Sequence, residues 1–411
     1  MADPTLSIRP GHPDFLDLDW GEALSGWTHS RLIELPTGIH RHVVRFVVYG
    51  DDIYAIKELP RRLANHEYEI LRALESRVSR VATPVGLVHR TWVPADEEPS
   101  AALITKYVPH TFPYRHLVSG ASFGARRGQM LDAVAGLLVE LHLSGLFWGD
   151  CSLSNLLYRY DAETIEAVMI DAETSELHDQ LTRGQRSHDL EIMIINVAGG
   201  MADIAAAEGM DIDDADMQLG SEIAGRYHAL WAELTNPVLV RQDERFRVHE
   251  RVERVNALGF EVEDIDIEPD PGGTPTLRLN VTVGGRNYHR SRLQTLTGVE
   301  ASEHQARQIL QDLAYYEATN RTDSDLGKSI AAVTWRVTIF EPLLEKIRSD
   351  MAPAFDAVQL YCDFLHHRYL MSAAQERDVP TDEAFKRWLS NGMPGFDTPS
   401  SVQSPEPAEL A

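Results

Sequence analysis

The sequence predicts an α+β chain of several domains, with strands concentrated near the start, helices in the middle and at the end, and a small α/β unit between them. Three observations predict it: strand-like runs around a Gly-Asp turn near residue 50, helical stripes from residue 129, and mixed patterns after residue 244. A length of 411 residues leaves room for two or three cores. We expect an N-terminal segment (1–27), a first lobe (28–108), a second lobe (109–240), a small α/β domain (241–323), a helical region (324–390) and a disordered tail (391–411).

The composition of the chain limits the classes of partner and the cellular setting that we expect. A formal net charge of -25 repels phosphate backbones and anionic membrane surfaces, so nucleic-acid binding is disfavoured. The two cysteines, Cys151 and Cys362, offer neither a disulfide framework nor paired metal-ligand spacing, which indicates a reducing, cytoplasmic setting. The first residues lack a signal segment and no uninterrupted apolar run approaches the length of a membrane span, so we expect no integral membrane segment.

In the first lobe, residues 33–36, 42–49 and 53–58 are typical of a β-meander, and Lys57 lies near the end of its third run. A helix should follow, because Leu63, Glu67, Leu71, Leu74 and Val78 fall at helical spacing. Glu67 therefore lies within an apolar stripe, where an unpaired charge is costly. Lys57 is its candidate partner. The alternative for Lys57 is an ordinary solvated strand lysine.

The second lobe carries the central pattern: Asp150, Asn155 five residues later, and Asp171 closing an apolar strand. Runs at 154–160 and 165–170 predict a hairpin that brings Asn155 and Asp171 together. Phosphoryl transfer needs a carboxylate to accept the proton of the incoming hydroxyl and a metal held against the phosphates. Asp150 would be that base, and Asn155 and Asp171 would hold Mg²⁺, which prefers oxygen ligands. Alternatively, Asp150 caps a loop and Asp171 merely ends a strand.

Two acidic residues beyond this pattern have open roles. Glu173 could be a second metal ligand or, as we slightly favour, a surface charge. Asp189, where a largely apolar helix is expected to start, could orient the backbone of the catalytic loop or act as an ordinary helix N-terminal residue.

Residues 28–240 resemble the protein-kinase-like fold, most like the bacterial lipopolysaccharide/Kdo kinase group and the small-molecule kinases. The whole chain also resembles bacterial proteins of unknown function that join such a half to an uncharacterised C-terminal half. The residues that carry the resemblance are Ala55-Ile56-Lys57, Glu67 with Leu71 and Leu74, Leu141-His142-x-x-Gly145-x-x-Trp148-Gly149-Asp150, Asn155 and Ile170-Asp171.

The resemblance implies ATP, Mg²⁺ and transfer to a hydroxyl, with Lys57 on the phosphates and held there by Glu67. It places the hinge that holds the adenine edge at Tyr107 and Val108, after the strand at 101–105. The phosphate loop has one glycine, Gly38, whose neighbouring backbone amides could still cover phosphates; a plain hairpin turn is the alternative.

Several positions depart from the protein-kinase pattern. Trp148 replaces the catalytic-loop His, Ala172-Glu173 replaces Phe-Gly, and Ser152 stands where a phosphate-contacting Lys is usual. The connection at 174–187 is short and lacks an Ala-Pro-Glu anchor. These departures favour a carbohydrate or other small hydroxyl compound over a protein substrate. The alternative is a nucleotide-binding pseudokinase or scaffold that recruits a protein partner through residues 241–390; nucleotidyl transfer is a third possibility.

The C-terminal half should contain a helix at 246–258, strands at 260–268 and 276–283, a capping-box helix from Ser302, and helices from 330 to 389. A local basic excess could hold an anionic substrate or, as we favour, make interdomain salt bridges; it comprises Arg278, Arg286, His289, Arg290 and Arg292. His366 and His367 are adjacent and so point in different directions on a helix, which indicates packing rather than a metal site.

Overall fold

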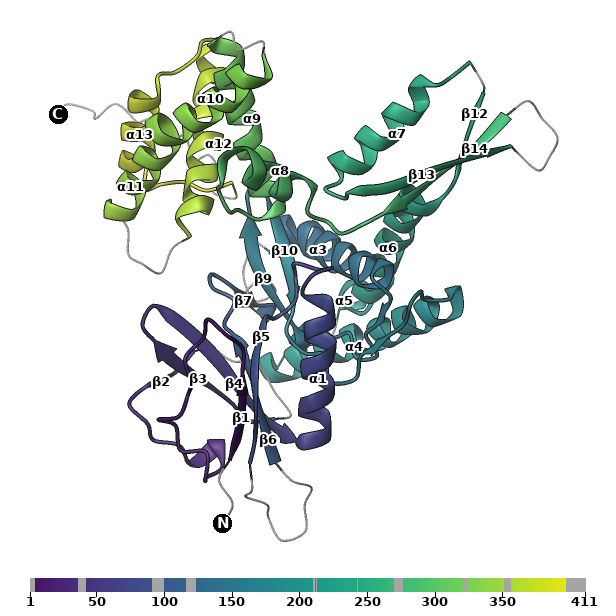
Figure 1. The fold of residues 1–411 in the computed structure, drawn as a ribbon, viewed down its shortest axis with the longest axis vertical. Coiled ribbons are helices and arrows are strands. Elements are labelled where there is room, and N and C mark those ends of the chain that lie inside the picture. Colours follow the sequence, from purple (N-terminus) through teal and green to yellow (C-terminus); the bar gives the residue numbers. More distant parts are fainter. Residues whose placement is uncertain are drawn as a thin grey trace. The chain divides into compact units, whose positions relative to one another are not determined.

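A computed structural model describes residues 4–35, 42–90, 100–115, 123–209, 211, 213–241, 243–269, 276–320, 324–350 and 356–396. The chain divides into two compact units, Met1–Arg159 with Ile165–Tyr288, and Tyr160–Thr164 with His289–Ala411 (Figure 1). This division cuts across the expected α/β domain at 241–323, whose sheet lies in the first unit and whose later helices lie in the second. The finer six-part division stays a prediction.

The first unit begins with a six-stranded antiparallel sheet in the order β1-β5-β6-β4-β3-β2. Its strands are β1 Thr5–Ile8, β2 Leu32–Ile33, β3 Val44–Tyr49, β4 Asp52–Pro60, β5 Pro84–His89 and β6 Ser100–Lys106. The expected meander corresponds to β2, β3 and β4. Strand β1 was not predicted, and neither was the burial of Phe15, Trp20 and Trp27, which lie in one cluster with Tyr54 and Ile56 of β4.

Strand β4 and helix α1 (Arg61–Leu74) place the first functional pair. Successive residues of a strand face opposite sides, so Tyr54 and Ile56 enter the aromatic cluster while Ala55 and Lys57 line a cavity on the other face. In α1 the expected apolar stripe is present, and Glu67 is buried within it. Helix α1 contacts β4, β5 and β6 (Figure 1). Glu67 on this helix lines the same cavity as Lys57.

The second lobe is mainly helical, with short strands that carry the catalytic loop. Its elements are β7 Phe112–Pro113, α3 Phe123–Leu143, β8 Leu146–Phe147, the 3-10 helix Leu153–Asn155, β9 Leu156–Asp161, β10 Thr164–Met169, β11 Glu176–Leu177, α4 Arg183–Glu208, α5 Asp214–Met217 and α6 Leu219–Thr235. Strands β10, β9 and β7 form one small sheet, and β11 pairs with β8.

A glycine turns the chain from α3 into the catalytic loop. Gly145 has a φ of +88°, and a Cβ built on it would lie 2.0 Å from the carbonyl oxygen of His178. Only glycine adopts this conformation without strain and leaves room for that carbonyl. Gly145 therefore follows the end of α3 at a position where the backbones of two segments touch.

Helix α4 packs against α6 and buries Leu190, Met193, Val197 and Met201. Among the described residues, it contains one stretch, Arg183–Ala207, that is long and apolar enough to cross a membrane by length and composition alone. The core helix of a soluble protein passes the same test.

The rest of the first unit is a three-stranded sheet in the order β12-β14-β13 with one helix. Its elements are β12 Val238–Arg241, α7 Phe246–Ala257, β13 Val262–Pro269 and β14 Thr276–Val283. The expected strands at 260–268 and 276–283 pair as β13 and β14, with a register shift between Val262 and Asp264. Strand β12 is an addition to the expected pattern.

The second unit is helical. It contains α8 Tyr288–Thr297, which spans the division, α9 Glu303–Thr319, α10 Asp325–Trp335, the π-helix Arg336–Phe340, α11 Glu341–Asp350, α12 Ala357–Gln375 and α13 Thr381–Ser390. One core cluster, which includes Leu313, Trp335, Tyr361, Phe364 and Trp388, holds these helices together.

The turn between β9 and β10 belongs to this second unit. Asp161 is fully buried and accepts hydrogen bonds from Ser302 Oγ (2.5 Å) and from the backbone N–H groups of His304 (3.1 Å) and Gln305 (2.8 Å). Ala162 exchanges two backbone hydrogen bonds with the amide of Gln359, at 2.9 and 3.1 Å. The expected capping box at Ser302 is present, and Asp161 adds a second cap from far along the chain.

Two other expectations concern the end of the chain. Residues 397–411 of the expected disordered tail lie outside the described residues. Just before them, Phe396 stacks on His366 with ring centroids 4.2 Å apart, and burial lowers the pKa of both His366 and His367. The packing interpretation of the His366-His367 pair therefore holds for His366.

Candidate active site

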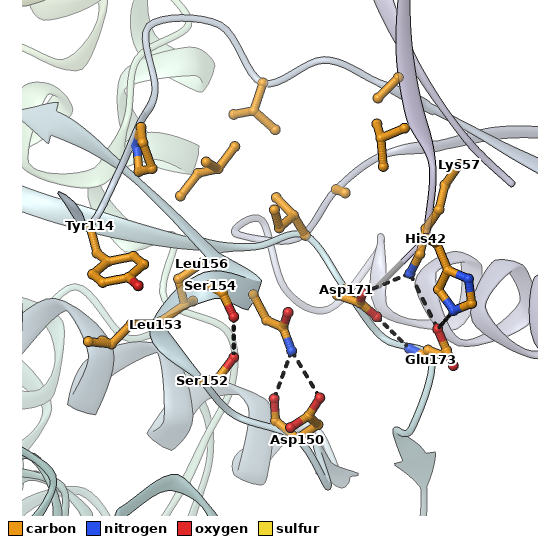
Figure 2. A pocket seen from close by; sticks show the side chains of 18 of the residues that line it. His42, Lys57, Tyr114, Asp150, Ser152, Leu153, Ser154, Leu156, Asp171 and Glu173 are labelled. Atoms are coloured by element: carbon orange, nitrogen blue, oxygen red, sulfur yellow. Dashed lines mark hydrogen bonds and ion pairs between the residues drawn. The ribbon is translucent and has the colours of Figure 1, made fainter. Parts of the chain in front are cut away.

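A cavity of about 640 Å³ lies in the first unit between its sheet and its helical lobe. Small-molecule and cofactor sites span roughly 300–1,000 Å³, so this cavity has the size of such a site. It is lined by all the candidate residues that the structure describes, namely Lys57, Glu67, Tyr107, Val108, Asp150, Asn155 and Asp171. Figure 2 shows Lys57, Asp150 and Asp171 among the lining residues. Gly38 lies outside the described residues.

Lys57 forms the expected ion pair with Glu67. Its Nζ lies 3.0 Å from Glu67 Oε2 and 2.7 Å from Asp171 Oδ2. Burial acts to lower the pKa of Lys57, but the neighbouring Glu67 and Asp171 outweigh burial and raise it. The side chain is therefore held as a cation between two carboxylates, and a solvated strand lysine does not fit these contacts.

Glu67 is 1% exposed and makes a second contact, accepting from the backbone N–H of Ala172 at 3.2 Å. Burial raises its pKa to about 7, although the pair with Lys57 opposes the shift. Through these contacts one carboxylate links β4, α1 and the chain that follows β10.

Backbone bonds place Asp171 just beyond the end of β10. The N–H of Met169 donates to the carbonyl of Arg80 at 3.0 Å, and its carbonyl accepts from Ala82 at 2.9 Å. The carbonyl of Asp171 accepts from Trp148 Nε1 at 3.0 Å, so Trp148 does more than fill the position of the usual His.

Asp150 and Asn155 lie together on the floor of the cavity (Figure 2). Asn155 Nδ2 donates to the backbone carbonyl of Asp150 (3.0 Å) and to its Oδ2 (3.3 Å). Burial raises the pKa of Asp150, the Asn155 hydrogen bond opposes this, and the nearby Asp171 adds to it. A carboxylate with a raised pKa that opens into a cavity is suited to accept a proton.

Asp189 orients the catalytic loop, and the prediction that a helix begins near it is wrong. Helix α4 begins at Arg183 and is capped by Thr182, one and a half turns earlier. Asp189 is fully buried and accepts from the backbone N–H groups of Trp148 (2.7 Å) and Gly149 (2.9 Å). Its Oδ2 also lies 3.0 Å from His142 Nε2, and burial lowers the pKa of that histidine.

At the hinge, Tyr107 and Val108 follow β6 and line the cavity. The N–H of Tyr107 donates to the carbonyl of Ile53 at 2.9 Å, and the carbonyl of Val108 accepts from Thr111 Oγ1 at 2.8 Å. These bonds hold the connection against the end of the sheet.

Sequence reasoning missed or underrated three residues of this site. Glu173 is largely buried rather than a surface charge: its Oε2 lies 2.9 Å from His42 Nε2 and 3.7 Å from Lys57 Nζ. Asn196 on α4 donates to Asp150 Oδ1 at 2.8 Å. The sequence offers no signal for His42, whereas Asn196, a polar residue in an apolar helix, was a detectable signal.

The donor set fits a magnesium ion bound together with phosphates. Among the described residues, no three His, Cys, Asp or Glu side chains group to hold a metal alone. Mg²⁺ is usually bound through one or two carboxylates plus substrate phosphates and water. Asp171 offers a carboxylate, and Asn155 directs its amide nitrogen to Asp150, leaving its amide oxygen for another ligand. Around them, several carboxylates share the single ammonium of Lys57.

Part of the C-terminal basic excess is engaged inside the second unit. His289 Nδ1 lies 2.6 Å from Glu303 Oε1, and the backbone N–H groups of His289 and Arg290 donate to the same carboxylate at 3.0 and 3.1 Å. Both interpretations of the basic excess, an anionic substrate and interdomain salt bridges, stay predictions.

Comparison with known proteins gives two family matches. Residues 48–211 match the lipopolysaccharide kinase (Kdo/WaaP) family, and residues 229–393 match a domain of unknown function, DUF4032. The search of curated proteins gave no match. One solved structure similar to this chain is described as WaaP in complex with acyl carrier protein; it has 15% identity and a TM-score of 0.34, and the match covers 56% of this chain and 88% of that one.

The lipopolysaccharide kinase match covers the strands, helix and loop that carry Lys57, Glu67, Asp150 and Asp171. It supports a kinase-like phosphotransferase as the functional class. The chain thus joins a segment that matches the lipopolysaccharide kinase (Kdo/WaaP) family, whose match suggests a kinase-like fold, to a segment that matches the DUF4032 family.

Proposed function

We propose that this protein is an ATP- and Mg²⁺-dependent phosphotransferase that moves the γ-phosphate to a hydroxyl of a carbohydrate or other small molecule. The observation that carries the proposal is the convergence of Lys57, Asp150, Asn155 and Asp171 on one cavity of about 640 Å³. These residues come from β4, the catalytic loop and the end of a hairpin, and protein kinases use the same set to hold phosphates, base and metal.

Each residue has a role within this proposal. Lys57 contacts the nucleotide phosphates, with Glu67 directing its ammonium group. Backbone groups of Tyr107 and Val108 would hold the adenine edge. The candidate phosphate-loop residue Gly38 lies outside the described residues, and its role stays a prediction. Asn155 and Asp171 hold Mg²⁺, whose chemistry when bound is to neutralise the charge that develops on the phosphates.

Asp150 acts as the base. The acceptor hydroxyl gives its proton to a carboxylate oxygen of Asp150 as its oxygen bonds to the γ-phosphorus, and the bond from that phosphorus to the departing ADP oxygen breaks. Asp189 supports the step from a distance, because it holds the backbone N–H groups of the two residues before Asp150.

The setting we propose is the cytoplasm. Both cysteines are free and buried, and burial raises the pKa of each thiol, which suits a compartment where disulfides are not needed. The partners we propose are a small-molecule or carbohydrate acceptor and, through residues 241–390, a protein.

The test begins with nucleotide binding. ATP with Mg²⁺ at about one hundred times its dissociation constant should add about 2.7 kcal/mol to the free energy of unfolding, measured by thermal denaturation. Incubation with ATP labelled in either the γ- or the α-phosphate, in a small-molecule cell extract, should then transfer the γ-label only. Transfer of the α-label would indicate nucleotidyl transfer instead.

The decisive variant is Asp150→Asn. It should retain the ATP-induced stabilisation and reduce γ-phosphate transfer by about 10²–10⁴-fold, the usual contribution of a general base. The matched control is Asp132→Asn, the same change at a largely exposed side chain of α3. ATP binding without transfer in the unaltered protein would favour the pseudokinase alternative, and an absence of stabilisation by ATP would contradict both.

A further inference from the structure

One face of helix α4 borders the cavity beside Asp150. Asn196, Gly199, Gly200 and Asp203 all line the cavity. Their spacing of three, four and seven residues from Asn196 places them on a single face of the helix. The nucleotide-binding residues proposed above come from β4, the hinge and the hairpin, so this face is a separate wall of the same cavity.

Asn196 holds the proposed base directly. Its Nδ2 donates to Asp150 Oδ1 at 2.8 Å and to the carbonyl of Cys151 at 3.3 Å. Asn155 Nδ2 donates to the other carboxylate oxygen, Oδ2. The carboxylate of Asp150 is therefore held between two amides, one from its own loop and one from α4.

The two glycines are not explained by packing. A Cβ built on Gly199 or on Gly200 would meet no heavy atom within 4 Å. Glycine is less favourable than alanine in a helix interior, so two adjacent glycines destabilise the helix. The helix thus contains two unfavourable glycines at positions where larger side chains would fit. The space beside these glycines lies next to the cavity.

The charge of this face limits what it can bind. Asp203 is exposed one and a half to two turns beyond Asn196, and Asp150 lies beside Asn196. The sequence from His188 to Glu208 contains no Lys or Arg. An anionic compound lying along this face would find two carboxylates and no counter-charge from the helix.

We propose that the face formed by Asn196, Gly199, Gly200 and Asp203 binds the phosphate acceptor, a hydroxyl compound that is uncharged or carries an ammonium group. Asn196 is a positioning residue for Asp150, and the glycines leave space for the acceptor. The inference rests on the proposed phosphotransferase function. The acceptor hydroxyl loses its proton to Asp150, its oxygen bonds to the γ-phosphorus, and ADP departs with the electrons of the broken phosphorus–oxygen bond.

The role of Asn196 is tested with water as the acceptor, by measuring kcat and KM for ATP hydrolysis. Asn196→Ala removes the hydrogen bonds to Asp150 Oδ1 and to the carbonyl of Cys151, so kcat should fall while KM for ATP and the ATP-induced stabilisation are retained. Asn196→Gln, which keeps an amide donor, should recover part of kcat.

The other charges near Asp150 stay in place in these variants. They are Asp171 and Glu173 after β10, Asp203 on α4 and Lys57 on β4, all of which line the cavity. The matched control is Glu191→Gln on the same helix, at an exposed side chain that pairs with His188. An unchanged kcat in Asn196→Ala, or a loss of kcat that Asn196→Gln does not recover at all, would overturn the positioning role.

The acceptor class is tested with three sugars of similar size: glucose, glucosamine and glucuronate, each at the same concentration with γ-labelled ATP. Glucose and glucosamine should accept label and glucuronate should not. Asp203→Lys should lower the ratio of glucosamine to glucose phosphorylation and raise labelling of glucuronate. Preference for glucuronate in the unaltered protein, or no transfer to any of the three, would overturn this acceptor class.

These outcomes separate the two proposals. If ATP and Mg²⁺ stabilise the protein and hydrolysis depends on Asp150, but no sugar is labelled, the acceptor inference fails while the phosphotransferase proposal stands. If ATP does not stabilise the protein, both fail.

Discussion

Lys57 has three carboxylates within 4 Å: Asp171 at 2.7 Å, Glu67 at 3.0 Å and Glu173 at 3.7 Å. One ammonium cannot neutralise three carboxylates, so this cluster is poised to gain positive charge. Protonation of Glu67 is one way to gain it, and binding of a metal ion with its nucleotide is another. Burial is the main reason why Glu67, the most buried of the three, has a pKa of about 7; Lys57 opposes this rise and Asp171 adds to it.

The raised pKa of Glu67 predicts a pH dependence of stability. Burial raises this pKa from 4.5 to about 7 in the folded protein. Between these values the folded state binds more protons than the unfolded state, so the contribution of Glu67 to the free energy of unfolding falls as pH rises from 4.5 to 7. Glu67→Gln should remove this contribution. Chemical denaturation at a series of pH values measures it as the difference between the two proteins.

Glu69 provides the control for that experiment, because it lies two residues away on the exposed side of α1. Glu69→Gln should leave the pH dependence of the free energy of unfolding unchanged. A Glu67→Gln curve parallel to that of the unaltered protein would contradict the assigned pKa.

At the scale of elements, the N-terminal end of α4 brings together the residue that caps the helix and the residue that supports the catalytic loop. Its N-terminus is capped by Thr182, and its first turns carry Asp189 into the core. There Asp189 binds the backbone of Trp148 and Gly149, which fixes the loop just before Asp150. Helix start and catalytic support are therefore separate features, six residues apart or more, and can be varied separately.

Asp189→Ala should cost both stability and activity. It leaves the buried N–H groups of Trp148 and Gly149 without their acceptor, at about 1–3 kcal/mol for each unsatisfied group. Transfer should fall because the catalytic loop loses its anchor. Thermal unfolding and γ-phosphate transfer measure the two effects.

Thr182→Ala is the matched variant for Asp189→Ala. It removes only the cap, whose Oγ1 accepts from the backbone N–H of Gln185 at 3.2 Å, and should cost about 1 kcal/mol. Transfer per folded molecule should be retained. Equal losses of transfer in both variants would show that Asp189 acts through helix stability alone.

At the scale of the whole molecule, the second unit is discontinuous in sequence. Residues 160–164 belong to it although β9 and β10, which they connect, lie almost entirely in the first unit. Within the second unit, Asp161 caps α9 and Ala162 pairs with Gln359 of α12. A chain that begins at residue 289 would therefore lack residues 160–164, which are part of the second unit.

This organisation predicts that a chain of residues 289–396 alone is less stable than the same residues in the intact protein. It lacks the Asp161 cap, and caps of this kind contribute about 0.5–2 kcal/mol. Hydrogen exchange of α9 measures the difference. Asp161→Ala in the full chain should reproduce most of it, whereas Glu163→Ala, at the partly exposed pair with Arg307, should have little effect. Equal protection of α9 in the short and full chains would contradict the prediction.

Local patterns in the sequence predicted much of the fold and of the candidate site. Period-two and helical spacings predicted the meander, the stripe that buries Glu67, and the hairpin after Asn155. The need of Glu67 for a partner followed from the cost of an unpaired charge in an apolar stripe, and the choice of Lys57 as that partner followed from the resemblance to protein kinases. Each of these depends on near neighbours in the chain or on a general penalty that any fold must satisfy.

Contacts between segments that are distant in the sequence could not be predicted from local patterns. Asp189 meets Gly149 across 40 positions, Asn196 meets Asp150 across 46, and Ser302 meets Asp161 across 141. A polar residue in an apolar helix predicts that a hydrogen-bond partner is needed. The identity of that partner depends on how distant segments pack together. The amino-acid sequence alone therefore identified the candidate site residues and their order along the chain. Tertiary packing alone determined which residues hold Asp150 in place and to which unit Asp161 belongs.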